Sequence, residues 1–188
     1  PERVRAGVKF WNKNHDSLER AKRVYGVEPH VIVSIIGVET FYGRITGGYR
    51  VLDALSTLSF AYPPRSKFFR KELKQFLLLS REEGKNPLGL IGSYAGAMGF
   101  GQFIPSSYRE YAVDFDGDGY RDIWSNETDA IGSVGNYFKR HGWSGEQLVV
   151  IPVRLLNESF PVQANTQWKP SKTVKELAEN GLNLESIE

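Results

Sequence analysis

The sequence predicts a mainly α-helical fold with a small α+β appendage at the C-terminus. Apolar residues recur at helical spacing along the 188-residue chain as far as about Gly142. Beyond that point apolar residues alternate with others around residues 149–153, and proline and asparagine become common, which indicates one or two strands. We therefore expect a helical core over residues 1–143 and an appendage over residues 144–188.

Caps and prolines divide the core into successive helices. The expected helices are residues 2–13, residues 16–25 with Asp16 as N-cap, a helix that begins at Pro29, a helix that Asp53 caps and that ends before Pro63, and residues 66–83. Residues 84–104 are rich in glycine, which favours tight turns and close backbone approach over a regular helix. Further helices are expected from Pro105, over residues 129–141 and, in the appendage, over residues 171–179.

Composition excludes several kinds of protein and site. The chain has no cysteine, so disulfides, thiol catalysis and thiolate metal sites are excluded. The net charge of +2 argues against nucleic-acid binding, and we interpret the basic residues of segment 65–71 as the solvated face of a helix. No apolar run approaches the roughly 18 residues of a membrane span. The three histidines are far apart in sequence, so neither a zinc site nor a Ser-His-Asp triad is expected.

Glu39 is the first candidate for a catalytic residue. It ends an apolar run that begins at Val31, and the helix must stop by Gly43. A carboxylate at this end of a helix faces the negative pole of the helix dipole, and no basic residue lies four positions away, so its charged form is disfavoured. Partial burial would raise its pKa further, and an acid that stays protonated near neutral pH is suited to general acid catalysis. The alternative is an ordinary exposed glutamate at a frayed helix end.

Residues 114–122 form the second candidate site, for a calcium ion. Acidic residues stand at the first, third, fifth and ninth positions, a glycine at the sixth permits a sharp turn, and the seventh residue can offer its carbonyl, as in an EF-hand loop. The expected ligands are Asp114, Asp116, Asp118, Tyr120 by its carbonyl, and Asp122. Ser125 replaces the usual glutamate at the twelfth position, so we expect Asp129 to close an enlarged loop. The alternative is a solvated acidic turn.

Three segments, taken together, point to a known family. They are Gly37-Val38-Glu39-Thr40 with Tyr42-Gly43-Arg44, the segment GSYAGAMGFGQFIPSSY at residues 92–108, and the acidic loop followed by Asp129-Ala130-Ile131-Gly132-Ser133. In this order, from about Gly7 to Trp143, they resemble the membrane-bound lytic transglycosylase B family. The resemblance implies a bacterial enzyme that cleaves peptidoglycan between N-acetylmuramic acid and N-acetylglucosamine. It also implies a lysozyme-like helical core that includes the calcium loop, residues 114–129.

The resemblance assigns roles to individual residues. Glu39 corresponds to the sole acid/base of the family, and calcium is structural, with no organic cofactor. Substrate contacts are implied for Ser93, Gln102, Phe103, Tyr137 and Arg65. Without the resemblance, the serine is equally a turn cap, the glutamine a backbone brace and the two aromatic residues part of the core.

The mechanism that the resemblance implies needs one carboxylate. Most glycosidases use two, but segment 92–108 contains no acid, and the loop aspartates are committed to calcium. Glu39 would therefore act first as acid and then as base, with 1,6-anhydromuramic acid as the product. The alternatives are a lysozyme-type hydrolase and a non-catalytic glycan-binding module with structural calcium. A calcium sensor is disfavoured, because the chain has one such loop and a single methionine.

The resemblance also implies a place and partners for the protein. We expect a periplasmic monomer that binds peptidoglycan strands, with no nucleic acid and no transmembrane segment. An outer-membrane anchor in the full-length protein and contacts with other cell-wall enzymes are compatible with this expectation. The family groove normally receives further aromatic residues from a segment that has no match here, so we interpret residues 144–188 as an incomplete appendage.

Overall fold

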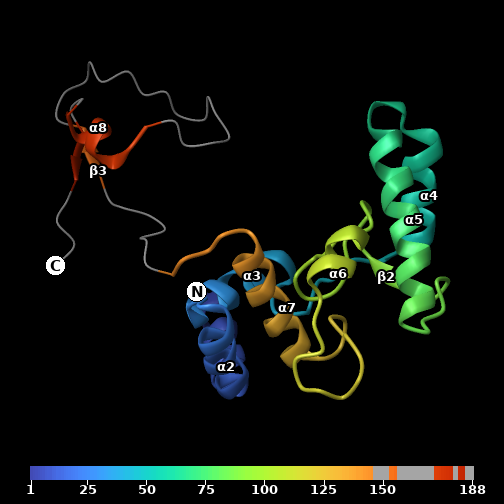
Figure 1. Cartoon of the computed structure of the whole chain (residues 1–188), viewed down its shortest axis with the longest axis horizontal. Coiled ribbons are helices and arrows are strands. Elements are labelled where there is room, and N and C mark those ends of the chain that lie inside the picture. The colour runs from blue at the N-terminus through green and yellow to red at the C-terminus, as the bar shows by residue number, and fades with distance from the viewer. Residues whose placement is uncertain (146–152, 156–171, 180–181, 185–188) are drawn as a thin grey trace. The chain divides into compact units, whose positions relative to one another are not determined.

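A computed structural model describes residues 1–145, 153–155, 172–179 and 182–184 (Figure 1). The backbone contacts divide the chain into two units, Pro1–Gly145 and Glu146–Glu188. The expected boundary, after residue 143, lies close to this division.

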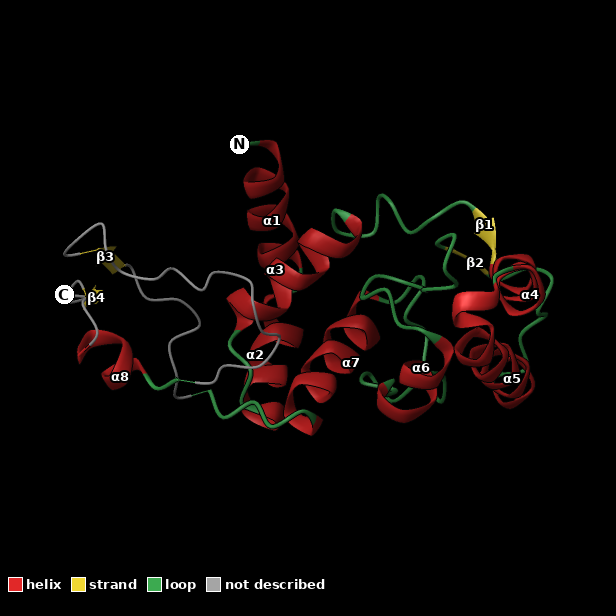
Figure 2. Cartoon of the chain, turned by 90° about the horizontal axis from the view of Figure 1, so that it is seen from above, coloured by secondary structure: helices red, strands yellow, loops and turns green. Residues whose placement is uncertain are grey.

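The regular secondary structure of the first unit is mainly helical, with long loops around α6 (Figure 2). Its helices are α1 Glu2–Lys13, α2 His15–Tyr25, α3 Pro29–Thr40, α4 Val51–Ala61, the 3-10 turn η1 Pro63–Arg65, α5 Ser66–Glu82, α6 Pro105–Tyr111 and α7 Glu127–Arg140. Two short strands, β1 Tyr49–Arg50 and β2 Ile91–Gly92, pair antiparallel. The mainly helical class predicted from the sequence is confirmed for this unit.

Two expected caps were wrong by one turn or less. Asp16 and Asp53 lie in the first turns of α2 and α4 rather than at their N-caps. Asp129, expected to begin a helix, lies in the first turn of α7. Carboxylates are favoured inside the first turn because the positive end of the helix dipole lies there. Asn126 caps α7 instead, and its side chain accepts hydrogen bonds from the backbone N–H groups of Thr128 and Asp129.

Helix α3 lies at the centre of the first unit. Helices α1, α2 and α7 all pack against it, which explains why it carries apolar residues on most of its surface. The side chains without solvent exposure include Leu18, Ile32, Ile36, Leu55, Phe76, Leu79, Met98, Tyr108, Ile123 and Ile131. Tyr108 is therefore a core residue, and its hydroxyl donates to the Arg121 carbonyl at 2.7 Å.

The chain turns sharply after α3. Phe41, Tyr42 and Gly43 follow one another with φ values of 52°, 60° and 82°, in the left-handed region. This turn directs the Tyr42 side chain back between α1 and α3, where its hydroxyl would lie 2.5 Å from a Cβ on Gly37. Only glycine leaves room for the ring at this position, and Tyr42 is partly buried and packs against the core.

The glycine-rich segment forms turns, as expected, and closes on the acidic loop. Met98 and Phe103 exchange two backbone hydrogen bonds of 2.9 Å. Within this turn Gly99 has φ 67°, and Phe100 donates its backbone N–H to the Ile123 carbonyl at 3.0 Å. The sequence motif at residues 99–104 is therefore fixed against the residues that follow the acidic loop.

The described part of the second unit contains one helix and two strands. Strand β3 Val153–Leu155 pairs antiparallel with β4 Leu182–Leu184, and α8 spans Val174–Glu179. The Thr173 hydroxyl accepts from the Glu176 backbone N–H, while the Glu176 carboxylate accepts from the backbone N–H of Thr173, as in a capping box. Residues 149–152 and residue 171, where the sequence predicted further strand and helix, lie outside the described residues.

Within the described part of the chain, no helix combines the length and the hydropathy that crossing a bilayer requires.

The tight approach at Gly99 predicts a specific loss of stability. An added Cβ would lie 2.4 Å from the Ile123 carbonyl oxygen, whereas a Cβ at Gly26, with a similar φ of 71°, would meet nothing within 4 Å. We expect Gly26→Ala to lower the free energy of unfolding by roughly 1–2 kcal/mol, from left-handed strain alone. Gly99→Ala should cost about 1–3 kcal/mol more, from overpacking. Urea denaturation of both variants measures the difference, and equal losses would contradict the steric argument.

Candidate active site

Glu39 lines a pocket formed by four segments. The pocket has a volume of about 330 Å³. Its lining consists of Ile35 and Glu39 from α3, Gly101, Gln102, Phe103 and Ile104 from the glycine-rich turn, Ser107 from α6, and Val134, Tyr137 and Phe138 from α7. Pockets for small ligands usually measure about 300–1,000 Å³ and have mostly apolar walls with a few polar groups, as this one has.

The carboxylate of Glu39 is exposed rather than partly buried as the sequence analysis considered. No other described side chain binds it through a hydrogen bond or an ion pair. The helix end that carries it is not frayed, because Thr40 is completely buried and its hydroxyl lies 2.9 Å from the Phe100 carbonyl. The Thr40 hydroxyl oxygen also accepts from the backbone N–H of Gly43 at 3.0 Å. The Glu39 side chain is thus exposed, while the helix end that carries it is held by Thr40. Only a bound ligand would exclude water from its carboxylate.

Gln102 connects two turns at the edge of the pocket. Its amide nitrogen donates to the carbonyls of Gly99, at 3.1 Å, and Thr46, at 3.3 Å. The backbone-brace interpretation of this residue is therefore visible in the structure. Its φ of 49° is unusual for a residue other than glycine, and such strain often occurs at functional sites. No described residue donates to the amide oxygen, so this oxygen is available to a ligand.

Aromatic side chains form one wall of the pocket. The rings of Phe103 and Tyr137 meet edge to face with centroids 6.0 Å apart. Tyr137 also stacks on His141, with centroids 4.0 Å apart, and Phe103 is only 5% exposed. Both residues therefore belong to the core as well as to the pocket.

Ser93 and Arg65 are not brought into this pocket. The Ser93 hydroxyl oxygen accepts from the backbone N–H groups of Ala95 and Ala97, at 3.2 and 3.1 Å, as a turn-capping serine does. Arg65 lies at the end of η1, where its guanidinium is 4.5 Å from the centre of the Phe68 ring. The substrate roles that the resemblance implies for these two residues stay predictions.

Several pocket residues were missed at the sequence level. They are Ile35, Gly101, Ile104, Ser107, Val134 and Phe138. Helical spacing could have identified Ile35, which precedes Glu39 by four positions, and Val134, which precedes Tyr137 by three. The signal for Ser107 is absent from the sequence, because only the packing of α6 brings it to the pocket.

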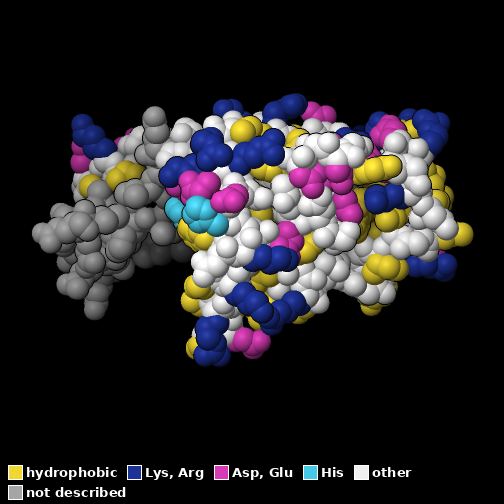
Figure 3. Space-filling view, turned by 90° about the horizontal axis from the view of Figure 1, so that it is seen from below, with side chains coloured by type: hydrophobic (Ala, Val, Ile, Leu, Met, Phe, Trp, Pro, Cys, Tyr) yellow, Lys and Arg dark blue, Asp and Glu magenta, His cyan; other side chains and the backbone are white. Residues whose placement is uncertain are grey.

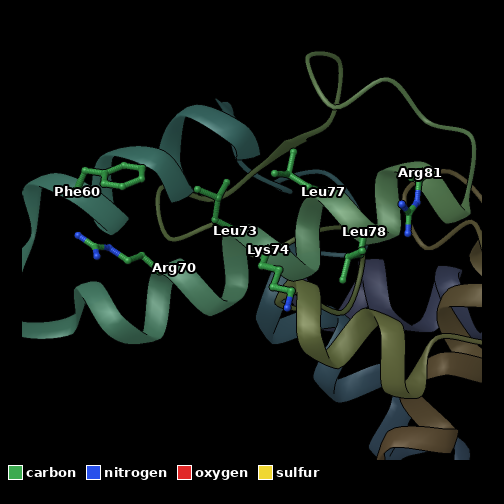
Figure 4. Close-up of a pocket in the computed structure, with 7 residues that line it drawn as sticks. All are labelled: Phe60, Arg70, Leu73, Lys74, Leu77, Leu78 and Arg81. Atoms are coloured by element: carbon green, nitrogen blue, oxygen red, sulfur yellow. The ribbon is translucent and has the colours of Figure 1, made fainter.

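Among the described residues, two of the further hollows lie on α5 and its neighbouring helices. One, on the hairpin of α4 and α5, is mostly apolar and has a volume of about 400 Å³ (Figure 4). It is lined by Phe60, Arg70, Leu73, Lys74, Leu77, Leu78 and Arg81, so no acid faces it. The other, which we call the polar pocket, has a volume of about 550 Å³ and is lined by Gln75, Ser106, Ser107, Arg109, Glu110 and Tyr111.

The acidic loop brings four carboxylates together. Oxygens of Asp114, Asp116, Asp118 and Asp129 all lie within 4.8 Å of one another. Four oxygen donors at this spacing match the preference of a hard divalent cation such as calcium. Gly117 and Gly119, with φ of 85° and 94°, allow the loop to fold around this cluster.

Asp129 joins the two ends of the acidic loop. It has no solvent exposure, and its two oxygens accept from the backbone N–H groups of Phe115 and Asp122, both at 2.7 Å. Burial raises the pKa of the Asp129 carboxyl above its ordinary value, and the charge of Asp116 acts in the same direction. In contrast, the backbone N–H of Gly119 and those of its neighbours lower the pKa of Asp114.

The other two expected ligands are placed differently. The carboxylate of Asp122 accepts from the backbone N–H groups of Trp124 and Ser125, at 2.9 and 3.1 Å, and so caps the turn instead of joining the cluster. The side chain of Tyr120 is 61% exposed, which is compatible with a role for its carbonyl alone.

Charges of both signs are distributed over the surface. On the face shown in Figure 3, lysine and arginine side chains form several separate groups with acidic side chains among them. This face therefore offers no continuous basic stripe of the kind that follows a nucleic-acid backbone.

The helical core and a single acid above an aromatic-walled pocket define a lysozyme-like protein. The chain belongs to the family described as the transglycosylase SLT domain, which matches residues 1–188. The family resemblance read from the sequence is confirmed.

Relatives of known name support the same assignment. The chain is 53% identical to the membrane-bound lytic murein transglycosylase B of Escherichia coli over 183 residues, which are 97% of this chain and 49% of that protein. The soluble lytic transglycosylase SltB1 of Pseudomonas aeruginosa is similar with a TM-score of 0.93 at 56% identity, over 98% of this chain and 62% of that one. The Escherichia coli lytic transglycosylase Slt35 in complex with calcium is similar with a TM-score of 0.90 at 51% identity, over 100% of this chain and 58% of that one. The chain thus spans about half the length of the curated relative.

The two hydrogen bonds of Asp129 predict a stability effect that needs no metal. In calcium-free buffer, Asp129→Ala should lower the free energy of unfolding by about 2–6 kcal/mol, because two N–H groups lose their acceptor and each costs about 1–3 kcal/mol. Asp118→Ala, at an exposed position of the same loop, should change it by less than about 1 kcal/mol. Denaturant titrations of both variants test this, and equal small losses would contradict the anchoring role of Asp129.

Proposed function

We propose that this chain contains the catalytic core of a lytic transglycosylase that cleaves the β-1,4 bond between N-acetylmuramic acid and N-acetylglucosamine in peptidoglycan. The observation that carries the proposal is the lone acid. Glu39 is the only carboxylic acid among the described residues that line its pocket. Two-carboxylate glycosidases need a second acid about 5–9.5 Å from the first. A lone acid suits a reaction in which the substrate supplies the remaining groups.

Glu39 acts twice in the proposed reaction. Its protonated carboxyl donates a proton to the glycosidic oxygen as the bond to C1 of the muramic acid breaks. The 2-acetamido oxygen of the same sugar stabilises the positive charge at C1. Glu39, now a carboxylate, takes the proton of the 6-hydroxyl, whose oxygen bonds to C1 and forms the 1,6-anhydro product. No water enters, and the attack within one sugar benefits from high effective molarity.

The neighbours of Glu39 serve binding in this proposal. The amide oxygen of Gln102 accepts from a sugar N–H or hydroxyl, and the rings of Phe103 and Tyr137 contact a sugar face. Ser93 can still donate its hydroxyl hydrogen, since its oxygen accepts only backbone N–H groups. Arg65 is assigned to a more distant part of the glycan strand, because it lies outside the Glu39 pocket.

We further propose that the acidic loop binds structural calcium. Asp114, Asp116, Asp118 and Asp129 would hold the ion, with the Tyr120 carbonyl as a further ligand and Asp122 as a support of the turn. The clustered charges favour this assignment, because without a cation they repel one another. The calcium complex of the similar Slt35 is consistent with it.

The setting of the protein follows from the proposed substrate. Peptidoglycan strands are the proposed partner, and the periplasm is the proposed location. The similar Escherichia coli protein is named membrane-bound, which fits an anchor in a full-length form. Contacts with other cell-wall enzymes and a monomeric state belong to the same proposal.

The lone-acid mechanism predicts the effect of one substitution. Glu39→Gln should reduce the release of muropeptides from peptidoglycan by at least about 10³-fold, since acid and base steps each contribute roughly 10²–10⁴-fold. Its melting temperature should stay unchanged, because no described residue depends on this carboxylate. Glu19→Gln on α2, outside both pockets, is the control and should retain full activity.

The mass of the products tests the reaction type. Mass spectrometry of the digest should show muropeptides that are one water lighter than reducing-end products, as anhydro sugars are. Reducing-end products alone would identify a lysozyme-type hydrolase instead, and substantial lysis by Glu39→Gln would remove Glu39 from its role.

Calcium binding predicts a change in thermal stability. With a dissociation constant of about 10⁻⁴–10⁻³ M, as in extracellular sites, calcium at about 10 mM should stabilise the fold by roughly 1–3 kcal/mol. The melting temperature should rise with calcium and fall with a chelator. Asp116→Ala, at an exposed ligand position, should abolish this response while leaving the calcium-free melting temperature nearly unchanged. Absence of both binding heat and a melting shift would refute the site.

A further inference from the structure

Glu72 is a buried acid that the proposed reaction does not use. It lies on α5 with 4% of its surface exposed, one turn away from the buried side chains of Phe69 and Phe76. No described lysine or arginine forms an ion pair with it. A buried carboxylate without a cation costs free energy unless hydrogen bonds replace the lost water. Its presence in the core therefore indicates a specific hydrogen-bond partner.

The partner of Glu72 is the first turn of α6. Its Oε2 accepts from the backbone N–H of Ser106 at 2.9 Å. Ser106 is the second residue of α6 and the first with an N–H group, because Pro105 has none. An N-cap side chain normally accepts from this position, but the N-cap of α6 is Ile104, which has no acceptor. Glu72 thus supplies from α5 the cap that α6 lacks in its own segment.

The side chain of Ile104 serves the pocket instead of the helix. It lines the Glu39 pocket together with Gln102, Phe103 and, from the first turn of α6, Ser107. A serine, threonine or aspartate at position 104 would cap α6 but would remove this apolar part of the pocket wall. Because α5 supplies the cap, one short segment can both line the pocket and begin a helix.

A second contact between α5 and α6 lies closer to the surface. Arg109 donates to both carboxylate oxygens of Glu82, at 2.8 and 2.6 Å. The side chains of this pair are 29% and 35% exposed, and ion pairs open to water contribute little to stability. The hydrogen bond from the buried Glu72 is therefore the stronger constraint on the start of α6.

We propose that Glu72 is a positioning residue of the candidate active site. By accepting from Ser106 it holds the start of α6, and with it segment 102–107, which forms one wall of the Glu39 pocket. Glu39 is held separately through Thr40, so Glu72 sets the distance between the acid and this wall. The inference rests on the proposed function, because its catalytic consequence assumes that a glycan binds between the two.

Two substitutions at position 72 separate the cap from the volume of the side chain. Glu72→Met keeps a similar length without a good acceptor, so KM for soluble peptidoglycan strands should rise about tenfold, as for one lost buried hydrogen bond. Because Glu39 and its support are untouched, kcat should change by less than about threefold. Glu72→Gln keeps an acceptor oxygen and should hold KM within about twofold of the native value. Initial rates of muropeptide release give both constants.

Ser80→Ala is the control for a loss of stability alone. Ser80 is a buried polar residue of the same helix, and its hydroxyl donates to the Phe76 carbonyl at 2.8 Å within α5. This variant should lower the melting temperature but leave KM and kcat unchanged. The inference is overturned if Ser80→Ala raises KM as Glu72→Met does, if Glu72→Met leaves KM unchanged, or if Glu72→Gln raises it equally.

Amide hydrogen exchange tests the cap without any assumption about activity. The N–H groups in the first turn of a helix have no acceptor within the helix and usually exchange rapidly. The Ser106 N–H should instead be protected in the native chain, and Glu72→Met should speed its exchange by at least about tenfold. An unprotected Ser106 in the native chain overturns the inference even if no variant folds. If the chain cleaves no peptidoglycan but the protection depends on Glu72, the proposed function fails while the placement of α6 by Glu72 stands.

Discussion

The buried hydroxyl of Thr40 holds the candidate active site together. It joins the last turn of α3 to the Phe100 carbonyl in the glycine-rich turn and to the backbone of Gly43 in the left-handed turn. Since Thr40 has no solvent exposure, losing this hydroxyl would leave buried polar groups without partners. The position of Glu39 relative to Gln102 and Phe103 is therefore set by its neighbour in the chain, and the Glu39 carboxylate itself has no hydrogen bond or ion pair with a described residue.

A continuous series of hydrogen bonds connects the acidic loop to this hydroxyl. Asp129 accepts from the backbone of Asp122, the next residue, Ile123, accepts from Phe100, and the Phe100 carbonyl meets Thr40. The acidic loop is thus linked to the pocket wall through backbone hydrogen bonds. A structural ion in that loop would support the pocket without taking part in the chemistry.

The sequence predicted the helical class and most helix positions, because periodicity and caps are local signals, and it singled out Glu39, which lines a pocket in the structure. It did not predict that Glu39 is exposed or that Asp122 caps a turn, since both depend on how distant segments pack. Ser107 illustrates the limit most clearly: its place between two pockets arises only when α6 packs on α5 and α7. The roles implied for Ser93 and Arg65 came from resemblance, and neither side chain reaches the described Glu39 pocket.

The pairing of β1 with β2 brings together the two ends of the segment that contains α4 and α5. Tyr49 faces Gly92 and Arg50 faces Ile91, so the chain leaves for the α4–α5 hairpin and returns at adjacent points. Segments whose ends meet in this way tolerate exchange, as domain insertions do. The hairpin supplies Gln75 to the polar pocket but nothing to the Glu39 pocket. Changes to the exposed residues of the hairpin can therefore alter the polar pocket while the acid and its support stay the same.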